Sequence, residues 1–214
     1  MRMRKLNKGE IPAVLAENVE WWTEEFVADP ENHTKRYRYR HPEIKAALLK
    51  ETAGKCVYCE SKVGHNTPGD TEHKIPSSED NTLHFSWTNL TIACSECNRR
   101  KNDYFRPSMP FLDPYVDDVE SVLVHLGPIV GWKPGYQRAE ITIRTLELHS
   151  GARRELISRK IERLEELSEL LERLASSSCD ELMGLLLTKR LEEMKSPDAE
   201  YSGMVMAACA AVER

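Results

Sequence analysis

Two Cys-x-x-Cys pairs constrain this 214-residue chain more than any other feature. The pairs are Cys56/Cys59 and Cys94/Cys97, and the 34 residues between them exceed the roughly 15–20 residues of simple zinc ribbons. Four thiolates suit Zn²⁺, and metal binding would supply folding energy that so short and irregular a segment cannot obtain from burial. We therefore expect a structural zinc site, with room for a functional hairpin between the pairs. The alternative is four unmetallated thiols.

The composition is that of an ordinary soluble globular protein, with 40% hydrophobic and 30% charged residues. No apolar run reaches the length of a membrane span, and the basic N-terminus lacks the apolar stretch of a secretion signal. We therefore expect a cytoplasmic protein without membrane contact. A reducing compartment favours metal binding over disulfides for the clustered cysteines. Cys179 and Cys209 lie in apolar, helical surroundings, which predicts small buried side chains.

The formal net charge of −5 argues against a protein that binds nucleic acid by overall charge alone. Any phosphate contacts would have to come from local basic patches. Such patches are present at residues 2–8, 35–40 and 99–101. The Glu-rich last third gives no reason to expect contact with nucleic acid.

Periodicity and turn signals predict a mostly helical α+β protein. Apolar residues at helical spacing predict a helix over residues 11–28, and Pro42 in a first-turn position predicts a second helix that ends at Gly54. The segment between the cysteine pairs predicts the order β, loop, β, helix. Its two strands and its helix are expected at residues 70–74, at residues 90–93, and from Cys94 or Ser95.

The remainder of the chain predicts a hairpin or irregular wrap within residues 111–137, then a helix over 138–148 in preference to a strand. Ser150 is the expected cap of a long helix with a leucine-rich stripe between Ile157 and Leu174. This stripe either packs on its own domain or docks a partner subunit. Two later helix starts are predicted from capping patterns, at Ser178 with Glu181 and at Ser196-Pro197.

Glu72 and His73 stand at the end of the first expected strand. Adjacent strand residues face opposite sides, so both reach one site only if the chain bends, and the Pro76 turn makes such a bend credible. Asp70 shares a strand face with Glu72, and it is either a further carboxylate of the site or, as we favour, a solvated strand residue. Two flanking loop histidines are interpreted as bystanders, His65 and His84.

These residues resemble a known motif. Glu72-His73, then Asn89 in Trp-Thr-Asn-Leu, then Asn98 and Lys101 after the second cysteine pair are similar to the HNH motif of ββα-metal endonucleases, here in an H-N-N form. The resemblance implies a zinc-stabilised ββα-metal core at residues 55–105. It would lie between an N-terminal helical segment at residues 1–54 and a mainly helical region at residues 106–214 that forms a hairpin or bundle.

The resemblance also implies a role for each matched residue. His73 would be the general base that takes a proton from the attacking water. Glu72 and Asn98 would hold a divalent ion on the reacting phosphate, and Asn89 would orient the loop that carries His73. Asn98 stands where the family often has histidine, so we expect Mg²⁺ or Mn²⁺ rather than a catalytic Zn²⁺. Flanking phosphates would be contacted by Arg99, Arg100 and above all Lys101.

The similarity extends beyond the motif to HNH proteins of the PtuB type, which are nuclease subunits of Septu anti-phage systems and of certain retron defence modules. It rests on residues 3–8, on Cys56-Val57-Tyr58-Cys59-Glu60, and on residues 138–148. It covers most of residues 3–160 in outline, whereas the helical C-terminus contributes little. The resemblance implies a PtuA-like ATPase partner, which could supply nucleic-acid affinity and control.

The function we infer is a metal-dependent HNH endonuclease that hydrolyses phosphodiester bonds, with DNA favoured and a structured RNA such as tRNA left open. The resemblance places it in a Septu-like defence complex. One alternative is a zinc-stabilised nucleic-acid-binding module without catalysis. Another is a stand-alone restriction-type HNH nuclease, although the sequence shows no additional DNA-reading motif.

Overall fold

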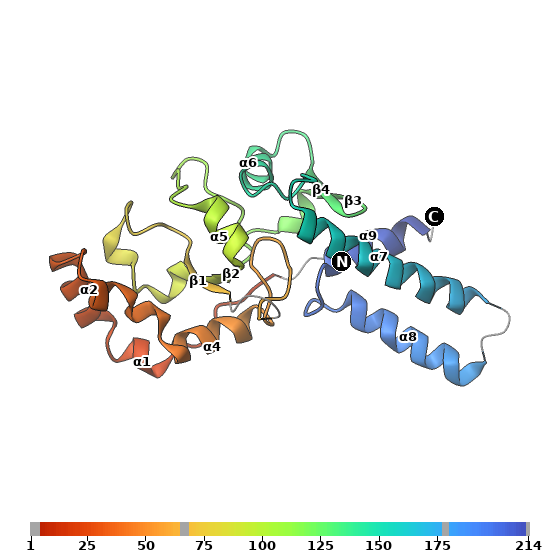
Figure 1. Ribbon diagram of the computed structural model, residues 1–214, viewed down its shortest axis with the longest axis horizontal. Coiled ribbons are helices and arrows are strands. Elements are labelled where there is room, and N and C mark those ends of the chain that lie inside the picture. The colour runs from red at the N-terminus through yellow and green to blue at the C-terminus, as the bar shows by residue number, and fades with distance from the viewer. Residues whose placement is uncertain (1–4, 65–68, 177–179, 213–214) are drawn as a thin grey trace. The chain divides into compact units, whose positions relative to one another are not determined.

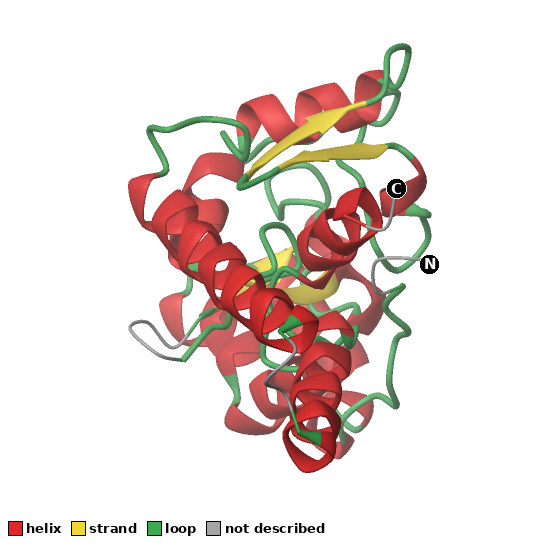
Figure 2. Cartoon of the chain, turned by 90° about the vertical axis from the view of Figure 1, so that its right-hand side faces the viewer, coloured by secondary structure: helices red, strands yellow, loops and turns green. Residues whose placement is uncertain are grey.

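The computed structural model describes residues 5–64, 69–176 and 180–212 (Figure 1). It divides the chain into two compact units, of which one is Leu6–Phe111 and the other is formed by the chain from Leu112 onwards. Helices dominate both units, and each contains one small β-hairpin, drawn in yellow in Figure 2. The predicted mostly helical α+β fold is confirmed. The predicted three-part division of the chain stays a prediction.

Short helices open the first unit. The predicted continuous helix over residues 11–28 is wrong, because the chain turns at Glu17 and Asn18, where the Asn18 side chain donates a hydrogen bond to the carbonyl of Val14. The helix predicted from Pro42 is confirmed, and Gly54, at φ +68°, closes its end by donating to the carbonyl of Leu49. The elements are α1 (Ala13–Ala16), α2 (Val19–Ala28), α3 (His33–Arg36), η1 (Tyr37–Arg40) and α4 (Pro42–Glu51).

The segment between the cysteine pairs has the predicted order of strand, loop, strand and helix. Strands β1 (Asp70–His73) and β2 (Leu90–Ala93) pair antiparallel, with Asp70 opposite Ala93 and His73 opposite Leu90. The loop between them contains η2 (Asn81–Leu83) and η3 (Trp87–Asn89). Helix α5 (Ser95–Lys101) follows β2 directly. Because β1 and β2 pair, the chain that enters β1 lies near the start of α5, which follows β2.

The N-terminal helices and the hairpin share one hydrophobic core. Strand β2 is buried at all four positions, as expected for a strand covered on both faces. Each fully buried leucine or phenylalanine of such a core contributes about 1.5–3 kcal/mol. The helices thus fix the strands from which the candidate site is built. The core residues include Leu15, Trp22, Phe26, Ile44, Leu48, Phe85, Leu90 and Ile92.

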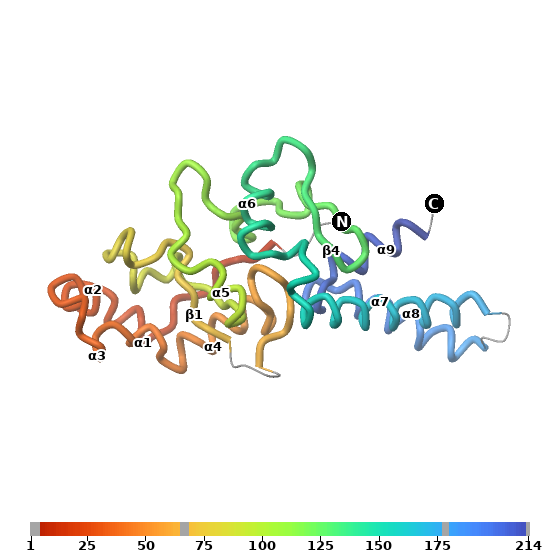
Figure 3. Tube along the Cα trace, turned by 45° about the horizontal axis from the view of Figure 1, so that its top comes forward, coloured from red at the N-terminus to blue at the C-terminus, as the bar shows by residue number. Residues whose placement is uncertain are grey.

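The second unit combines a hairpin with four helices among the described residues. The hairpin predicted within residues 111–137 and the helix predicted over 138–148 are both confirmed. Long helices α7 and α8 lie side by side and run in opposite directions (Figures 1 and 3). The elements are η4 (Val119–Ser121), β3 (Leu123–Leu126), β4 (Ile129–Trp132), α6 (Gln137–Thr145), α7 (Arg154–Ala175), α8 (Glu181–Lys195) and α9 (Ser202–Val212).

Two of the predicted helix caps are wrong. Ser150 does not cap α7, which begins after Arg153, because the Ser150 hydroxyl accepts a hydrogen bond from the amide of Ala152 in the preceding turn. Ser196-Pro197 does not start the last helix, because the Ser196 hydroxyl accepts from Asp198 in another local turn. Serine turns and serine caps use the same short hydrogen bond, so the sequence pattern does not separate them.

A third predicted cap, Ser178, lies outside the described residues. Helix α8 is capped instead by Asp180, whose carboxylate accepts a hydrogen bond from the amide of Met183. Cys179 and His65 also lie outside the described residues.

The leucine-rich stripe of α7 packs within its own unit between Leu164 and Leu174, whereas Ile161 is 42% exposed, so docking of a partner subunit by part of the stripe stays a prediction. Its residues meet α8 and α9 in a cluster built around Leu167, Leu170, Met194, Val205 and Cys209. The prediction that Cys209 is a small buried side chain is confirmed. In the part of the chain that the structure describes, no helix has both the length and the apolar character needed to cross a bilayer.

Candidate functional site

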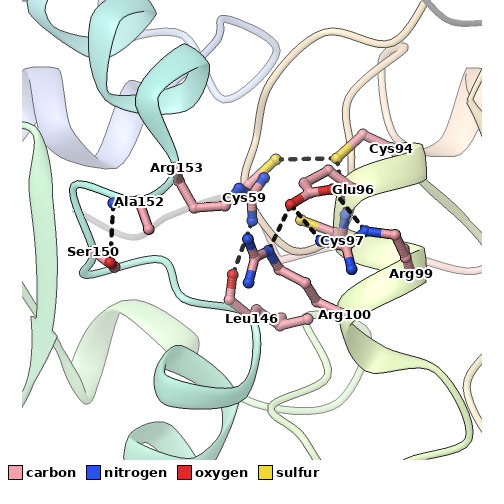
Figure 4. Close-up of polar contacts among 10 residues, drawn as sticks. All are labelled: Cys59, Cys94, Glu96, Cys97, Arg99, Arg100, Leu146, Ser150, Ala152 and Arg153. Atoms are coloured by element: carbon pink, nitrogen blue, oxygen red, sulfur yellow. Dashed lines mark hydrogen bonds and ion pairs between the residues drawn. The ribbon is translucent and has the colours of Figure 1, made fainter.

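The four cysteines of the two pairs meet at one point. Cys56 and Cys59 lie in the turn after α4, Cys94 caps α5, and Cys97 lies in the first turn of that helix. All four Sγ atoms lie within 4.8 Å of one another, and those of Cys59 and Cys94 are 3.8 Å apart (Figure 4). A tetrahedral ZnS₄ centre with Zn–S bonds of about 2.3 Å needs sulfurs about 3.8 Å apart. The cluster therefore fits a structural zinc ion.

The thiols of this cluster are electrostatically unequal. Burial raises the pKa of Cys56, whereas hydrogen bonding from Cys56 lowers the pKa of Cys59 and of Cys94. A closed group of this kind cannot carry four negative charges without a cation. A bound zinc ion would compensate these charges, and its binding would release protons.

A separate pocket of about 470 Å³ opens beside the hairpin and α5. It brings together four of the residues that the sequence predicted as catalytic, and Asp70 and Arg99 line it as well. Asn89 and Arg100 do not appear among the described residues that line it. The four predicted residues in its wall are Glu72, His73, Asn98 and Lys101.

The His73 ring is held in one orientation. Its Nε2 lies 2.8 Å from the carbonyl oxygen of His84, and Tyr39 packs edge-on against it with ring centroids 4.6 Å apart. A carbonyl only accepts, so Nε2 carries the proton and the lone pair resides on Nδ1. Burial lowers the pKa of His73 to about 3, so the imidazole is neutral at physiological pH. A neutral imidazole has a lone pair available to accept a proton, but a pKa of about 3 makes it a weaker base than an ordinary histidine.

Asn89 is buried and joins the two sides of the loop between the strands. Its Oδ1 accepts from the amide of Ile75 at 2.8 Å, and its Nδ2 donates to the carbonyls of Ile75 at 3.0 Å and Leu83 at 3.1 Å. These bonds hold the chain that leaves β1 against the chain that approaches β2. This is the geometry that the positioning role predicted for Asn89 requires.

Glu72 and Lys101 form a buried ion pair. The Lys101 ammonium lies 2.6 Å from Glu72 Oε1 and also donates to the carbonyl of His73 at 2.8 Å. Lys101 is only 4% exposed, because the last turn of α5 directs its side chain towards β1. The sequence-based expectation placed Lys101 at flanking phosphates. The structure instead places its ammonium between the Glu72 carboxylate and the carbonyl of His73. Burial raises the pKa of the Glu72 carboxyl against the opposing effect of Lys101.

Asp70 is part of the pocket rather than a solvated strand residue. Asn98 Nδ2 donates to Asp70 Oδ2 at 3.1 Å, which ties α5 to β1. This bond engages the amino group of the Asn98 amide and leaves its Oδ1 to act as a ligand atom. Carboxylate and amide oxygens from Asp70, Glu72 and Asn98 thus face one pocket. Such a set of hard donors fits Mg²⁺ or Mn²⁺.

Arg99 and Arg100 share Glu96 as a partner (Figure 4). Glu96 Oε1 lies 2.9 Å from Arg99 Nη2 and 2.7 Å from Arg100 Nε. The side chain of Arg99 is 67% exposed and lines the pocket, whereas that of Arg100 is 15% exposed. Arg99 is therefore the better placed of the two to meet a phosphate at the pocket.

Sequence reasoning missed the surroundings of His73. His84, interpreted there as a bystander, is 2% exposed and stacks on His73 with ring centroids 4.5 Å apart. Arg36 and Tyr39 also line the pocket, from the basic patch at residues 35–40. The alternation of arginine and tyrosine in that patch is a signal for a binding surface. The patch lies far from His73 along the chain, so the sequence does not indicate that Tyr39 packs against His73.

Comparison with known proteins adds to this geometry. Residues 56–104 match the family described as HNH endonuclease, and this segment contains the cysteine cluster together with β1, β2 and α5. The chain is also similar to two curated relatives named Septu protein PtuB. Identity to the one from Bacillus thuringiensis is 35% over 77 residues, which is 36% of this chain and 30% of the relative.

Identity to the relative from Bacillus mycoides (strain KBAB4) is 31% over 149 residues, and the match covers 55% of this chain and 50% of the relative. The chain therefore spans at most about half the length of these two curated relatives. The matched family segment covers the hairpin and α5, whereas the longer similarity reaches beyond it.

Proposed function

Residues 56–104 belong to the HNH endonuclease family, whose members are phosphodiester hydrolases, and from this premise we propose that the chain is a metal-dependent endonuclease acting on nucleic acid. The observation that carries the proposal is the pocket geometry. His73, with its lone pair on Nδ1, lies in one pocket with the oxygen donors of Glu72, Asp70 and Asn98. A base and a set of hard metal ligands are the two requirements of metal-assisted phosphodiester hydrolysis.

In this proposal His73 Nδ1 takes a proton from the water that attacks the phosphorus atom. The proton on Nε2 stays bonded to the carbonyl of His84, so the ring does not rotate during the transfer. Glu72 and Asn98 would hold the divalent ion, which when bound stabilises charge on the phosphate and on the leaving 3′ oxygen. The products would carry a 5′ phosphate and a 3′ hydroxyl.

The cysteine cluster would position these groups without taking part in the chemistry. Cys94 caps α5 and Cys97 lies in its first turn, and the same helix carries Asn98 and Lys101. Cys56 and Cys59 tie the chain before β1 to that helix start. Zinc in this cluster would therefore fix α5 relative to β1, and so Asn98 relative to Glu72.

The similarity to two PtuB proteins supports a finer proposal about setting. We place the chain in a Septu-like anti-phage defence complex with a PtuA-like ATPase partner, and we favour DNA as the substrate. The net charge of −5 is consistent with a partner that contributes nucleic-acid affinity. Co-expression with a PtuA-like ATPase, followed by copurification and measurement of the mass of the complex, tests this setting.

Cleavage by purified protein tests the nuclease proposal itself. Plasmid DNA, single-stranded DNA and tRNA are each incubated with the chain, alone and with the copurified ATPase, in Mg²⁺, in Mn²⁺ and in EDTA. We expect metal-dependent cleavage that His73→Ala abolishes. The matched control is His33→Ala, because His33 is exposed and is absent from the residues described as lining the pocket. Equal cleavage by the wild type and His73→Ala would overturn the assignment of the base.

A further inference from the structure

A column of aromatic rings lies against the base. Phe26 stacks on His84 with ring centroids 4.1 Å apart, and His84 stacks on His73 with centroids 4.5 Å apart and planes 13° from parallel. Tyr39 packs edge-on against both histidines. His84 is thus enclosed between the hydrophobic core and the base. The residue is only 2% exposed, although it is among those that line the pocket.

Both nitrogens of His84 have partners. Nε2 lies 2.7 Å from the carbonyl oxygen of Arg36, and Nδ1 contacts the hydroxyl of Ser77. The carbonyl accepts only, so Nε2 donates to Arg36 and Nδ1 accepts from Ser77. One tautomer of His84 satisfies both contacts. The ring is therefore fixed in position and in proton distribution, as expected for a fully satisfied buried polar group.

The backbone carbonyl of the same residue contacts His73. The carbonyl oxygen of His84 is the acceptor for His73 Nε2, at 2.8 Å. It is a backbone group that any residue at this position would have, so the His84 side chain matters by anchoring it. The anchors come from far along the chain, because Arg36 lies 48 residues before His84. The basic patch at residues 35–40 and the base are thereby linked through a single ring.

A residue that only filled space would not need these contacts. A phenylalanine could occupy the gap between Phe26 and His73 and stack on both rings. It would supply no donor for the carbonyl of Arg36 and no acceptor for Ser77. The use of a histidine with both nitrogens satisfied points to a requirement for orientation in addition to packing.

We propose that His84 is a positioning residue that keeps His73 in its Nε2–H tautomer, with the Nδ1 lone pair directed into the pocket. The proposal rests on the assignment of His73 as the base. In this arrangement Ser77 and the Arg36 carbonyl anchor His84, and His84 anchors His73 through its carbonyl and its ring. Loss of the anchors would leave the metal ligands in place and would lower the fraction of His73 that is ready to accept a proton.

Nitrogen-15 NMR of the imidazole rings in the full-length, zinc-loaded protein tests this proposal directly. The wild type is expected to show His73 as the Nε2–H tautomer. His84→Phe keeps the stacking and removes both hydrogen bonds, so a measurable fraction of the Nδ1–H tautomer should appear. This readout does not depend on cleavage. A wild type that cleaves nothing would count against the proposed function and would leave the test of His84 intact.

Kinetics supply the second readout. For His84→Phe we expect kcat to fall about 10- to 100-fold, the range expected when a reacting group is displaced, while KM and zinc content stay unchanged. Ser77→Ala removes the hydroxyl that contacts His84 Nδ1 and keeps the ring stack. We therefore expect a smaller fall in kcat and a smaller fraction of the Nδ1–H tautomer than in His84→Phe. Ser77→Ala also provides the test if His84→Phe fails to fold. His149→Phe, a histidine beside Trp132 in the second unit, is the matched control.

Three results would overturn the proposal. One is an unchanged His73 tautomer and unchanged kcat in folded, zinc-loaded His84→Phe, or in Ser77→Ala where His84→Phe does not fold. The other is a wild type in which His73 populates the Nδ1–H tautomer. The third is a rise of KM in His84→Phe without a change in kcat, because that result would assign His84 to substrate binding.

Discussion

The cysteine cluster and the pocket are built on the same short segment, yet they differ in nearly every physical respect. The cluster has four identical soft ligands, and three of the four cysteines are buried. The pocket has mixed oxygen and nitrogen donors and an exposed Arg99 in its wall. A closed tetrathiolate site suits an ion that holds structure, whereas an open site suits an ion that must admit a substrate and water.

The contrast extends to the side chains behind each site. The cysteine sulfurs contact one another, and the Cys94 sulfur also accepts a hydrogen bond from the amide of Cys97. The pocket depends on a second set of buried polar groups, because Asn89 orients the loop, Lys101 pairs with Glu72 and His84 holds His73. Buried polar groups are costly unless every partner is in place. A rigid zinc-bound frame beneath the pocket is one way to keep those partners in place.

The largest expected effect comes from breaking the cluster. Cys97→Ser should prevent stable zinc binding and unfold the unit Leu6–Phe111, because structural zinc contributes on the order of 10 kcal/mol and domain stabilities are only about 5–15 kcal/mol. Zinc content and near-UV circular dichroism are the measurements. Cys209→Ser, which alters a buried cysteine in the other unit, should keep its zinc. Retention of the native spectrum by zinc-free Cys97→Ser would contradict the structural role of the cluster.

The next effect comes from removing the base. His73→Ala should lower the rate of cleavage about 10²- to 10⁴-fold, the usual contribution of a general base, with zinc content close to that of the wild type and a lower melting temperature, because the stacked ring and its hydrogen bond are lost. Single-turnover cleavage at saturating Mg²⁺ is the measurement. Loss of zinc together with activity in His73→Ala would contradict the claim that the cysteine cluster and the pocket have separate roles.

A third test concerns Asp70 and the Asn98 amide. Asp70→Ala removes the acceptor that engages Asn98 Nδ2, so the affinity for Mn²⁺ should fall about 10- to 100-fold. Titration calorimetry and the electron paramagnetic resonance of Mn²⁺ measure this without a cleavage assay. Asp70→Asn keeps an acceptor oxygen and should lose less. If Asp70→Asn weakens binding as much as Asp70→Ala, the carboxylate is itself a ligand rather than an orienting group.

The smallest expected effect, taken per histidine and per pH unit, is on the pH dependence of stability. Burial lowers the pKa of His73 to about 3 and of His84 to about 4, from the usual 6.5. Below pH 6.5 the unfolded chain binds protons that the folded chain does not, so stability should fall as pH decreases from 6.5 towards 4. Each histidine contributes about 1.4 kcal/mol per pH unit in that window.

Urea unfolding at pH 7, 6 and 5 measures this slope. Protonation of the zinc-binding thiolates acts in the same direction, so the comparison is made between the wild type and His84→Phe. The variant should lose the contribution of one histidine and show a shallower slope. Identical slopes would mean that His84 titrates normally in the folded protein.

Sequence patterns located the parts of this site whose signals are local. The hairpin, the start of α5 and the cysteine cluster follow from strand periodicity and ligand spacing within residues 56–101. Capping was less predictable, as Ser150 and Ser196 show, because a serine hydroxyl makes the same short hydrogen bond in a turn and at a helix start. The break between α1 and α2 has a similar origin in the side chain of Asn18.

The details behind the pocket could not be predicted in this way, because they depend on contacts between distant residues. Nothing near His84 in the sequence indicates that its ring meets the carbonyl of Arg36. The inward orientation of Lys101 depends on how α5 packs against β1. Family resemblance assigns roles to motif residues, whereas the residues that orient them become visible only in three dimensions.

The division between a structural metal and a catalytic metal is tested most directly by removing the two metals in sequence. Mg²⁺ is removed first by buffer exchange and zinc afterwards with a chelator, while zinc content, near-UV circular dichroism and cleavage are followed on the same sample. We predict that cleavage stops with zinc and spectrum unchanged, and that added Mg²⁺ restores it in full. Loss of cleavage that tracks the loss of zinc, or cleavage that persists without Mg²⁺ or Mn²⁺, would contradict the account.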